Sequence, residues 1–157
     1  GKFKFEVDDA FFFSHLNQTQ EFNGAIEIEK VGQSLNGLFP TELRRAFLRE
    51  KEVMQLHDTL FKTKNKHAIA IVGEIGVGRH TLVQEALYRY LSNYYSATKG
   101  RKQQLWQVDP NRIIAGMSIV GMWQKRFEAI LEYVQHPVQE KDAFDSIIFD
   151  NPIALLR

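Results

Sequence analysis

The chain contains no cysteine, which excludes disulfide bonds and thiolate metal sites. We therefore expect a reducing compartment, the cytoplasm. No apolar run approaches the length of a membrane span, so a membrane partner is not expected. Neither sign of charge is in large excess, because the chain has 20 Lys and Arg residues and 19 Asp and Glu residues, for a formal net charge of +1. This balance gives no indication of a nucleic-acid partner.

The composition is that of an ordinary globular protein. With 157 residues, 44% of them hydrophobic and 25% charged, the chain can bury a core as one domain or as a small domain with an extension. It begins with Gly1 and ends at Arg157, shortly after a strand-like segment. We therefore expect it to be a fragment of something longer.

Residues 68–81, AIAIVGEIGVGRHT, form the most informative stretch of the sequence. An apolar run ends in a glycine loop, and a helix-compatible run follows, which is the context of a phosphate-binding P-loop. Glycines let backbone N–H groups converge on an anion, and the helix N-terminus adds partial positive charge. A plain tight turn is the alternative interpretation. The predicted nucleotide-binding residues are Gly73, Glu74, Ile75, Gly76, Val77, Gly78, Arg79, His80 and Thr81.

This loop departs from the consensus G-x-x-x-x-G-K-[ST] at its two chemical positions. Arg79 replaces the lysine, and His80 replaces the hydroxyl residue that would bind magnesium. An arginine can neutralise phosphate, but its planar fork does not reproduce the point charge of a lysine. The alternatives are a solvated helix-start residue for Arg79 and a helix-start or packing residue for His80. The loop thus predicts nucleotide binding and leaves hydrolysis in question.

Strands and helices alternate after the loop, and this order predicts an α/β fold with a parallel sheet. The expected elements are a strand at 68–72, a helix at about 79–95, a strand at 105–109, a helix at about 122–135 and a strand at 145–150. The last strand ends at Asp150, where P-loop ATPases carry the acid that supports magnesium, usually through water. Asn151 follows, and its amide cannot accept a proton from an attacking water.

The first 40 residues are predicted to form a small α+β extension, followed by a second unit at 41–157. Alternating patterns at 2–8 and 25–31 indicate strands. A helical region is expected to open at Pro40, with a further helix at about 50–62, where apolar residues recur at helical spacing.

From about residue 41 onward, the sequence resembles the first ATPase module of the Clp unfoldases and disaggregases, of the AAA+ superfamily. Residues 47–53, FLREKEV, are similar to the family's V-I-G-R-E-x-E-I, and residues 71–79 are similar to L-x-G-E-P-G-V-G-K. Residues 115–121, AGMSIVG, stand where the family has A-G-x-K-Y-R-G, followed by a similar helix at 126–131. Residues 147–151 match a strand that ends in D-E.

The resemblance implies a P-loop AAA+ core, a parallel sheet flanked by helices that is truncated after the strand ending at Asp150. It also implies ATP or ADP with Mg as cofactors, a homo-oligomer (hexameric in the family) and a polypeptide substrate or partner protein. It places Phe47 and Leu48 beside the adenine. Ser118, Ile119 and Val120 fall in a substrate pore loop, where Ile119 replaces the family's tyrosine and Ser118 its basic neighbour. Packing of Ile119 inside the domain is the alternative.

Two classes of function follow from this pattern. The first is a Clp-like ATP-binding module of a protein-unfolding or remodelling machine, with impaired hydrolysis. The second is a catalytically degenerate nucleotide sensor or an assembly scaffold, suggested by the combined replacements at Arg79, His80 and Asn151. A P-loop kinase or GTPase is a weaker third candidate, which the adenine and pore-loop segments disfavour. Whether the protein is an enzyme stays open at this point.

Overall fold

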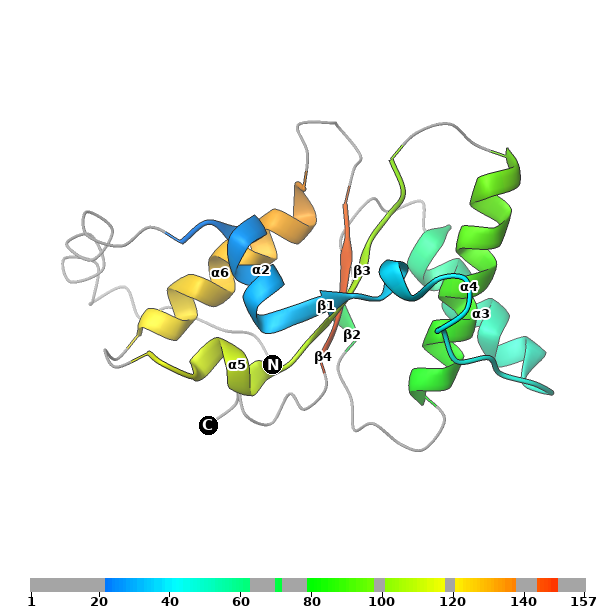
Figure 1. The fold of residues 1–157 in the computed structure, drawn as a ribbon, viewed down its shortest axis with the longest axis horizontal. Helices are drawn as coiled ribbons and strands as arrows, with labels where there is room; N and C mark the ends of the chain where they lie inside the picture. Colours follow the sequence, from blue (N-terminus) through cyan, green and yellow to red (C-terminus); the bar gives the residue numbers. More distant parts are fainter. Residues whose placement is uncertain are drawn as a thin grey trace.

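The computed structural model describes residues 22–62, 70–71, 79–97, 101–117, 121–137 and 144–149. Its elements are α2 (Gly24–Val31), β1 (Gly32–Ser34), the 3-10 helix η2 (Leu35–Leu38), α3 (Glu50–Phe61), β2 (Ala70–Ile71), α4 (Arg79–Ala97), β3 (Leu105–Val108), α5 (Pro110–Ile114), α6 (Met122–Gln135) and β4 (Ser146–Phe149). Figure 1 shows α2, α5 and α6 on one side of the central strands and α3 and α4 on the other. The predicted α/β class is confirmed.

A four-stranded sheet with the order β1-β3-β4-β2 occupies the centre of the molecule. β3 and β4 run parallel, and so do β4 and β2, where Ile71 lies opposite Ile148. β1 pairs with β3 in the antiparallel direction, so the sheet is mixed rather than wholly parallel. The three parallel strands fall within the ranges that the sequence predicted.

The two faces of the sheet bury two different cores. Successive side chains of a strand point to opposite faces, so β4 contributes Ile147 and Phe149 to one core and Ile148 to the other. The first core also contains Ile28, Val31, Val108, Ile113, Phe127, Ile130 and Val134. The second contains Leu35, Leu43, Val83, Leu87, Leu91 and Leu105. Burial on both faces explains why the sequence of β4 reads as a nearly continuous apolar run.

The helices predicted from long periodic segments are present. α4 was expected at about 79–95 and extends from Arg79 to Ala97. α6 matches its predicted range of 122–135 and buries Phe127, Ile130 and Val134, which recur every three or four residues. None of the helices in the described parts of the chain is long and apolar enough to cross a membrane.

Residues 25–31 were predicted as a strand, and this prediction is wrong, because they belong to helix α2. The side chain of Asn23 caps the helix by accepting hydrogen bonds from the backbone N–H groups of Ala25 and Ile26 at 3.0 and 3.3 Å. Ile28 is fully buried while Ile26 is 53% exposed, a difference that a strand with both on one face would not give. In a seven-residue amphipathic segment, the period of 3.6 residues of a helix and the period of 2 residues of a strand cannot be told apart.

The helical region expected to open at Pro40 is also absent. Residues 40–49 form turns and irregular backbone, and the next helix begins at Glu50. The backbone N–H of Arg44 donates instead to Oε1 of Gln84 on α4, at 2.7 Å. β1 joins the same sheet as the later strands, and α2 packs against α6. The proposed boundary at residue 40 stays a prediction, and the strand expected at 2–8 lies outside the described residues.

Candidate functional site

The glycine loop and the candidate magnesium acid follow two neighbouring strands. β2 and β4 are parallel and adjacent, so their carboxyl ends lie at the same edge of the sheet. In open α/β sheets this edge is where ligands bind. The loop begins two residues after Ile71, and Asp150 directly follows Phe149. The predicted residues Gly73, Glu74, Ile75, Gly76, Val77, Gly78, Asp150 and Asn151 themselves lie outside the described residues.

Helix α4 begins at the end of the glycine loop. Its first residue is Arg79, and His80 and Thr81 follow in the first turn, both half-buried. The first N–H groups of a helix lack intrahelical acceptors, and the helix dipole adds partial positive charge there. Leu82, Val83 and Leu87 of α4 are buried and pack the helix into the core. The three predicted residues at the helix start are thus held on a rigid element.

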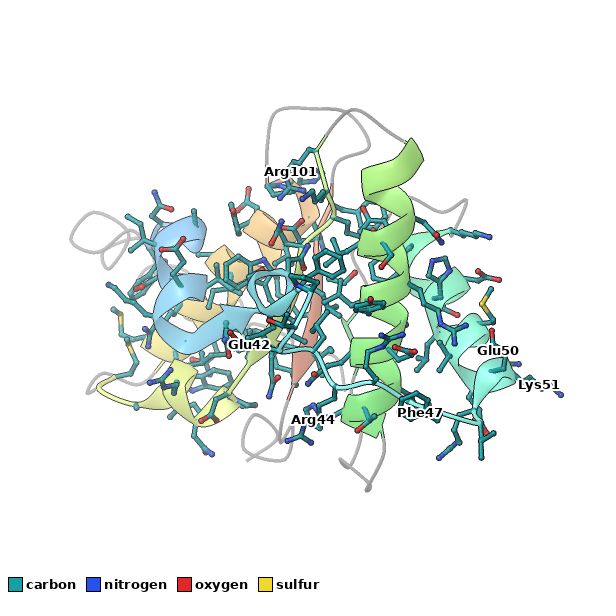
Figure 2. The ribbon with its side chains drawn as sticks, turned by 45° about the vertical axis from the view of Figure 1, so that its right-hand side comes forward. Glu42, Arg44, Phe47, Glu50, Lys51 and Arg101 are labelled. Carbon is teal, nitrogen blue, oxygen red and sulfur yellow. The ribbon has the colours of Figure 1, made fainter. Side chains whose placement is uncertain are left out.

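The segment that carries Phe47 and Leu48 is fastened to this same helix. Figure 2 shows the segment passing across α4 on its way from Glu42 to Glu50. The guanidinium of Arg45 donates from Nε to Oε2 of Glu85 at 2.5 Å and lies 3.6 Å from the centre of the Tyr88 ring. This cation–π contact and the hydrogen bond attach the segment to the second and third turns of α4.

Four charged residues of alternating sign, Arg45, Glu85, Arg89 and Glu50, continue this attachment to α3. We call them the charge ladder. Arg89 donates from both terminal nitrogens to the carboxylate of Glu50, with the Nη2–Oε2 distance at 2.7 Å, and its Nη2 lies 3.8 Å from Oε1 of Glu85. The side chain of Glu85 is only 3% exposed, so it depends on its two arginines. The ladder therefore joins the segment at 44–50, α4 and α3.

The ladder also perturbs the ionisation of its members. The hydrogen bond from Arg89 lowers the pKa of the Glu50 carboxyl below its ordinary value. The hydrogen bond to Glu85 raises the pKa of the Arg45 guanidinium, while burial acts in the opposite direction. Both changes favour the charged forms. Arg45 and Glu50 therefore meet their partners in the ladder as charged groups.

Phe47 and Leu48, the predicted adenine contacts, project into solvent. Phe47 is 79% exposed and Leu48 is fully exposed. Leu48 also has a φ of 63°, in the left-handed region that favours glycine. In the resembled motif V-I-G-R-E the glycine stands at the position of Leu48. The backbone thus takes a glycine-like conformation although a leucine occupies the position.

The predicted pore loop follows a short helix that the sequence analysis missed. α5 covers Pro110–Ile114, and its N-cap Asp109 accepts a hydrogen bond from the N–H of Asn111 at 2.9 Å. Gly116 and Gly121 have φ values of 78° and 90° and bracket the loop, whereas Ser118, Ile119 and Val120 lie outside the described residues. An Asp followed by Pro is a helix-start signal that could have revealed α5.

The charge ladder was missed for a different reason. Its hydrogen-bonded pairs, Arg45 with Glu85 and Arg89 with Glu50, are 40 and 39 positions apart, and no local sequence pattern indicates such pairs. The described ranges contain no group of three or more His, Asp or Glu side chains that could hold a metal ion.

No family model matches the chain. Three curated relatives are similar to it, all named chaperone protein ClpB. The one from Aquifex aeolicus is 28% identical over 109 residues, which is 69% of this chain and 11% of the relative. Those from Mycoplasma pneumoniae and Mycoplasma genitalium are 26% and 25% identical over 109 residues, 15% of each relative.

The chain thus spans less than a sixth of the length of these relatives. The α/β sheet is consistent with part of an AAA+ module, although the glycine loop lies outside the described residues. The similarity supports a relationship to the Clp chaperones at the level of the family.

Proposed function

We propose that this chain is part of a Clp-like AAA+ module that binds ATP or ADP at the edge formed by β2 and β4. The observation that carries the proposal is the parallel pairing of these two strands, with α4 starting directly after the glycine loop. That arrangement brings the ends of the strands that precede the glycine loop and Asp150 to one edge of one sheet. The proposed role is in protein unfolding or remodelling within a homo-oligomer, hexameric as in the resembled family.

The residues available fit the phosphates better than they fit the metal. The glycine loop and the first turn of α4 would hold the phosphates, and Phe47 and Leu48 would contact the base. Asp150 would support Mg²⁺ through water. Mg²⁺ prefers oxygen ligands, so a histidine at position 80 is a poor substitute for a hydroxyl. Asn151 lacks the carboxylate that would accept a proton from water. Nucleotide binding with impaired hydrolysis is the expected result.

The second candidate is a nucleotide sensor or assembly scaffold without ATPase activity. It is favoured by one observation, the coincidence of the three replacements Arg79, His80 and Asn151 in a chain whose apolar framework is intact. This candidate has the same fold as the first and differs from it in lacking ATP hydrolysis.

Calorimetric titration with ATP and ADP, with and without Mg²⁺, followed by a phosphate-release assay, separates these possibilities. Binding with turnover identifies an ATPase module, binding alone identifies a sensor, and the absence of both identifies a scaffold. Gly78→Ala should weaken binding if the loop holds phosphate. Gly37→Ala is the matched control, because Gly37 lies in η2 and has open space where a Cβ would be added. Equal binding by both variants would contradict the proposal.

A competition series with GTP, CTP and UTP tests the P-loop kinase or GTPase alternative. A preference for GTP over ATP would contradict the proposed Clp-like module. Sedimentation analysis with and without nucleotide tests the proposed oligomer.

A further inference from the structure

Arg126 is a buried arginine of α6, four residues after the helix begins at Met122, and its side chain is 8% exposed. Its Nη1 donates to the backbone carbonyls of Arg112 and Ile113, at 2.9 and 3.3 Å. These carbonyls belong to the last turn of α5, where a helix has no intrahelical donors to satisfy them. The guanidinium therefore acts as a cap for α5 that is supplied by a different helix.

The same guanidinium faces a buried acid of α2. Nε of Arg126 lies 3.6 Å from Oε1 of Glu27, whose side chain is also 8% exposed. The other carboxylate oxygen of Glu27 lies 3.3 Å from Nζ of Lys30. A buried guanidinium is costly unless its charge is matched, and here Glu27 matches the charge while the carbonyls of α5 accept from Nη1. Nε of Arg126 and Oε2 of Glu27 are buried without a hydrogen-bond partner, so the charge pairing with Glu27 carries this side of the contact. Arg126 thus joins α2, α5 and α6.

These contacts lie at both flanks of the predicted pore loop. On the first flank, the backbone N–H groups of Ala115 and Met117 donate to carbonyls of α5, those of Asn111 and Ile114, at 2.9 and 3.2 Å. On the second flank, Gly121 is the N-cap of α6, the helix that carries Arg126. One side chain consequently fixes the end of α5 relative to the start of α6.

We propose that Arg126 is a positioning residue that sets the separation of these two flanks, and that Glu27 makes this setting depend on α2. The significance for polypeptide binding rests on the proposed function, but the positioning itself rests on described contacts alone. Polypeptide binding by the residues between the two flanks would then depend on α2, the helix that precedes β1. A methylene-rich side chain of equal length could fill the space but could not cap the carbonyls.

The test compares Arg126→Lys with Ile130→Val in the full chain by amide hydrogen exchange. Lysine keeps the charge beside Glu27 but lacks the planar fork that caps both carbonyls and faces the acid together. Ile130→Val removes one buried methylene-sized group from the same helix and leaves the hydrogen bonds from Arg126 to α5 in place, so it controls for a general loss of stability. Exchange at Ala115 and Met117 should rise about tenfold in Arg126→Lys after normalisation to amides of α4.

Glu27→Gln should raise exchange at the same two amides by a smaller factor, because it weakens the partner of Arg126 and leaves the cap in place. Equal normalised exchange at Ala115 and Met117 in Arg126→Lys and Ile130→Val would overturn the proposal. So would a rise in exchange spread evenly over the whole of α6.

Binding of carboxymethylated, permanently unfolded lactalbumin separates this proposal from the proposed function. If exchange responds as expected but the unmutated chain does not bind the polypeptide with nucleotide present, the positioning role stands and the remodelling function fails. If the unmutated chain binds and Arg126→Lys changes neither exchange nor affinity, the remodelling function stands and the positioning role fails. A several-fold weaker affinity in Arg126→Lys, together with the local rise in exchange, supports both.

Discussion

Leu48 combines two unfavourable properties at the scale of a single residue. Its side chain is fully exposed, and its backbone lies in the left-handed region at a φ of 63°. A residue with a Cβ pays roughly 1–2 kcal/mol in that conformation. The neighbouring contacts explain why the backbone is held there, since Arg45 is attached to α4 and Glu50 to Arg89 on either side.

Replacing Leu48 with glycine should therefore leave the free energy of unfolding unchanged or raise it by up to about 1 kcal/mol. Glycine relieves the strain, while its greater freedom in the unfolded chain cancels part of the gain. Urea denaturation measures the effect. Phe47→Gly is the control, because Phe47 is also exposed and has no positive φ to relieve. If Leu48→Gly destabilises the protein as much as Phe47→Gly does, the left-handed assignment is wrong.

A second residue-scale prediction concerns the two replaced positions of the glycine loop. The double change Arg79→Lys with His80→Thr should strengthen binding of magnesium nucleotide. Lysine restores a compact charge, and threonine restores a hydroxyl for the metal. One charge-assisted hydrogen bond contributes about 1.5–3 kcal/mol, so a gain of about tenfold or more in affinity is expected by calorimetry. An affinity that does not change would mean that this loop does not hold phosphate.

At the scale of elements, the charge ladder explains how three pieces of the chain keep a fixed arrangement. Glu85 is its centre, because this nearly buried carboxylate meets guanidinium groups from the segment at 44–50 and from its own helix. Glu85→Gln keeps the shape and removes the charge. We expect the free energy of unfolding to fall by about 1–2 kcal/mol, since Arg45 remains 42% exposed and water compensates part of the loss.

The matched control for this change is Glu52→Gln. Glu52 pairs with Arg49 at 2.6 Å, but both side chains are 49% exposed, so its loss should cost less than about 0.5 kcal/mol. Thermal or urea denaturation of the two variants gives the comparison. Equal effects would mean that burial of Glu85 adds nothing to the strength of the ladder.

The elements differ in how far the sequence predicted them. α4 and α6 could be predicted because their apolar residues repeat over several turns, and β4 because it is apolar on both faces. α2 could not, because its eight residues fit both periods and only its packing against α6 decides between them. The candidate site divides in the same way. The order of loop, helix and acid is a local pattern of the sequence, and of these three the structure describes only the helix. The ladder and the cap on α5 join residues far apart in the sequence, which no local pattern predicts.

At the scale of the whole molecule, the sheet and its cores include residues that precede the predicted boundary at residue 40. β1 extends the sheet beyond β3, and α2 covers the face that α6 also covers. Ile28, Val31 and Leu35 are almost completely buried, and they lie in residues assigned from the sequence to an extension. The cores on both faces of the sheet therefore include side chains of this N-terminal segment.

A pair of truncations tests this dependence. Residues 41–157 alone should not unfold cooperatively, because the deletion removes three core side chains that each contribute roughly 1.5–3 kcal/mol when buried. It also uncovers Val108 and Ile130, which share a core with Ile28. The total approaches the whole stability of a typical domain, about 5–15 kcal/mol. Residues 22–157 retain every described contact and should keep a cooperative transition. Circular dichroism during urea denaturation measures both, and a cooperative 41–157 fragment would show that residue 40 is a true domain boundary.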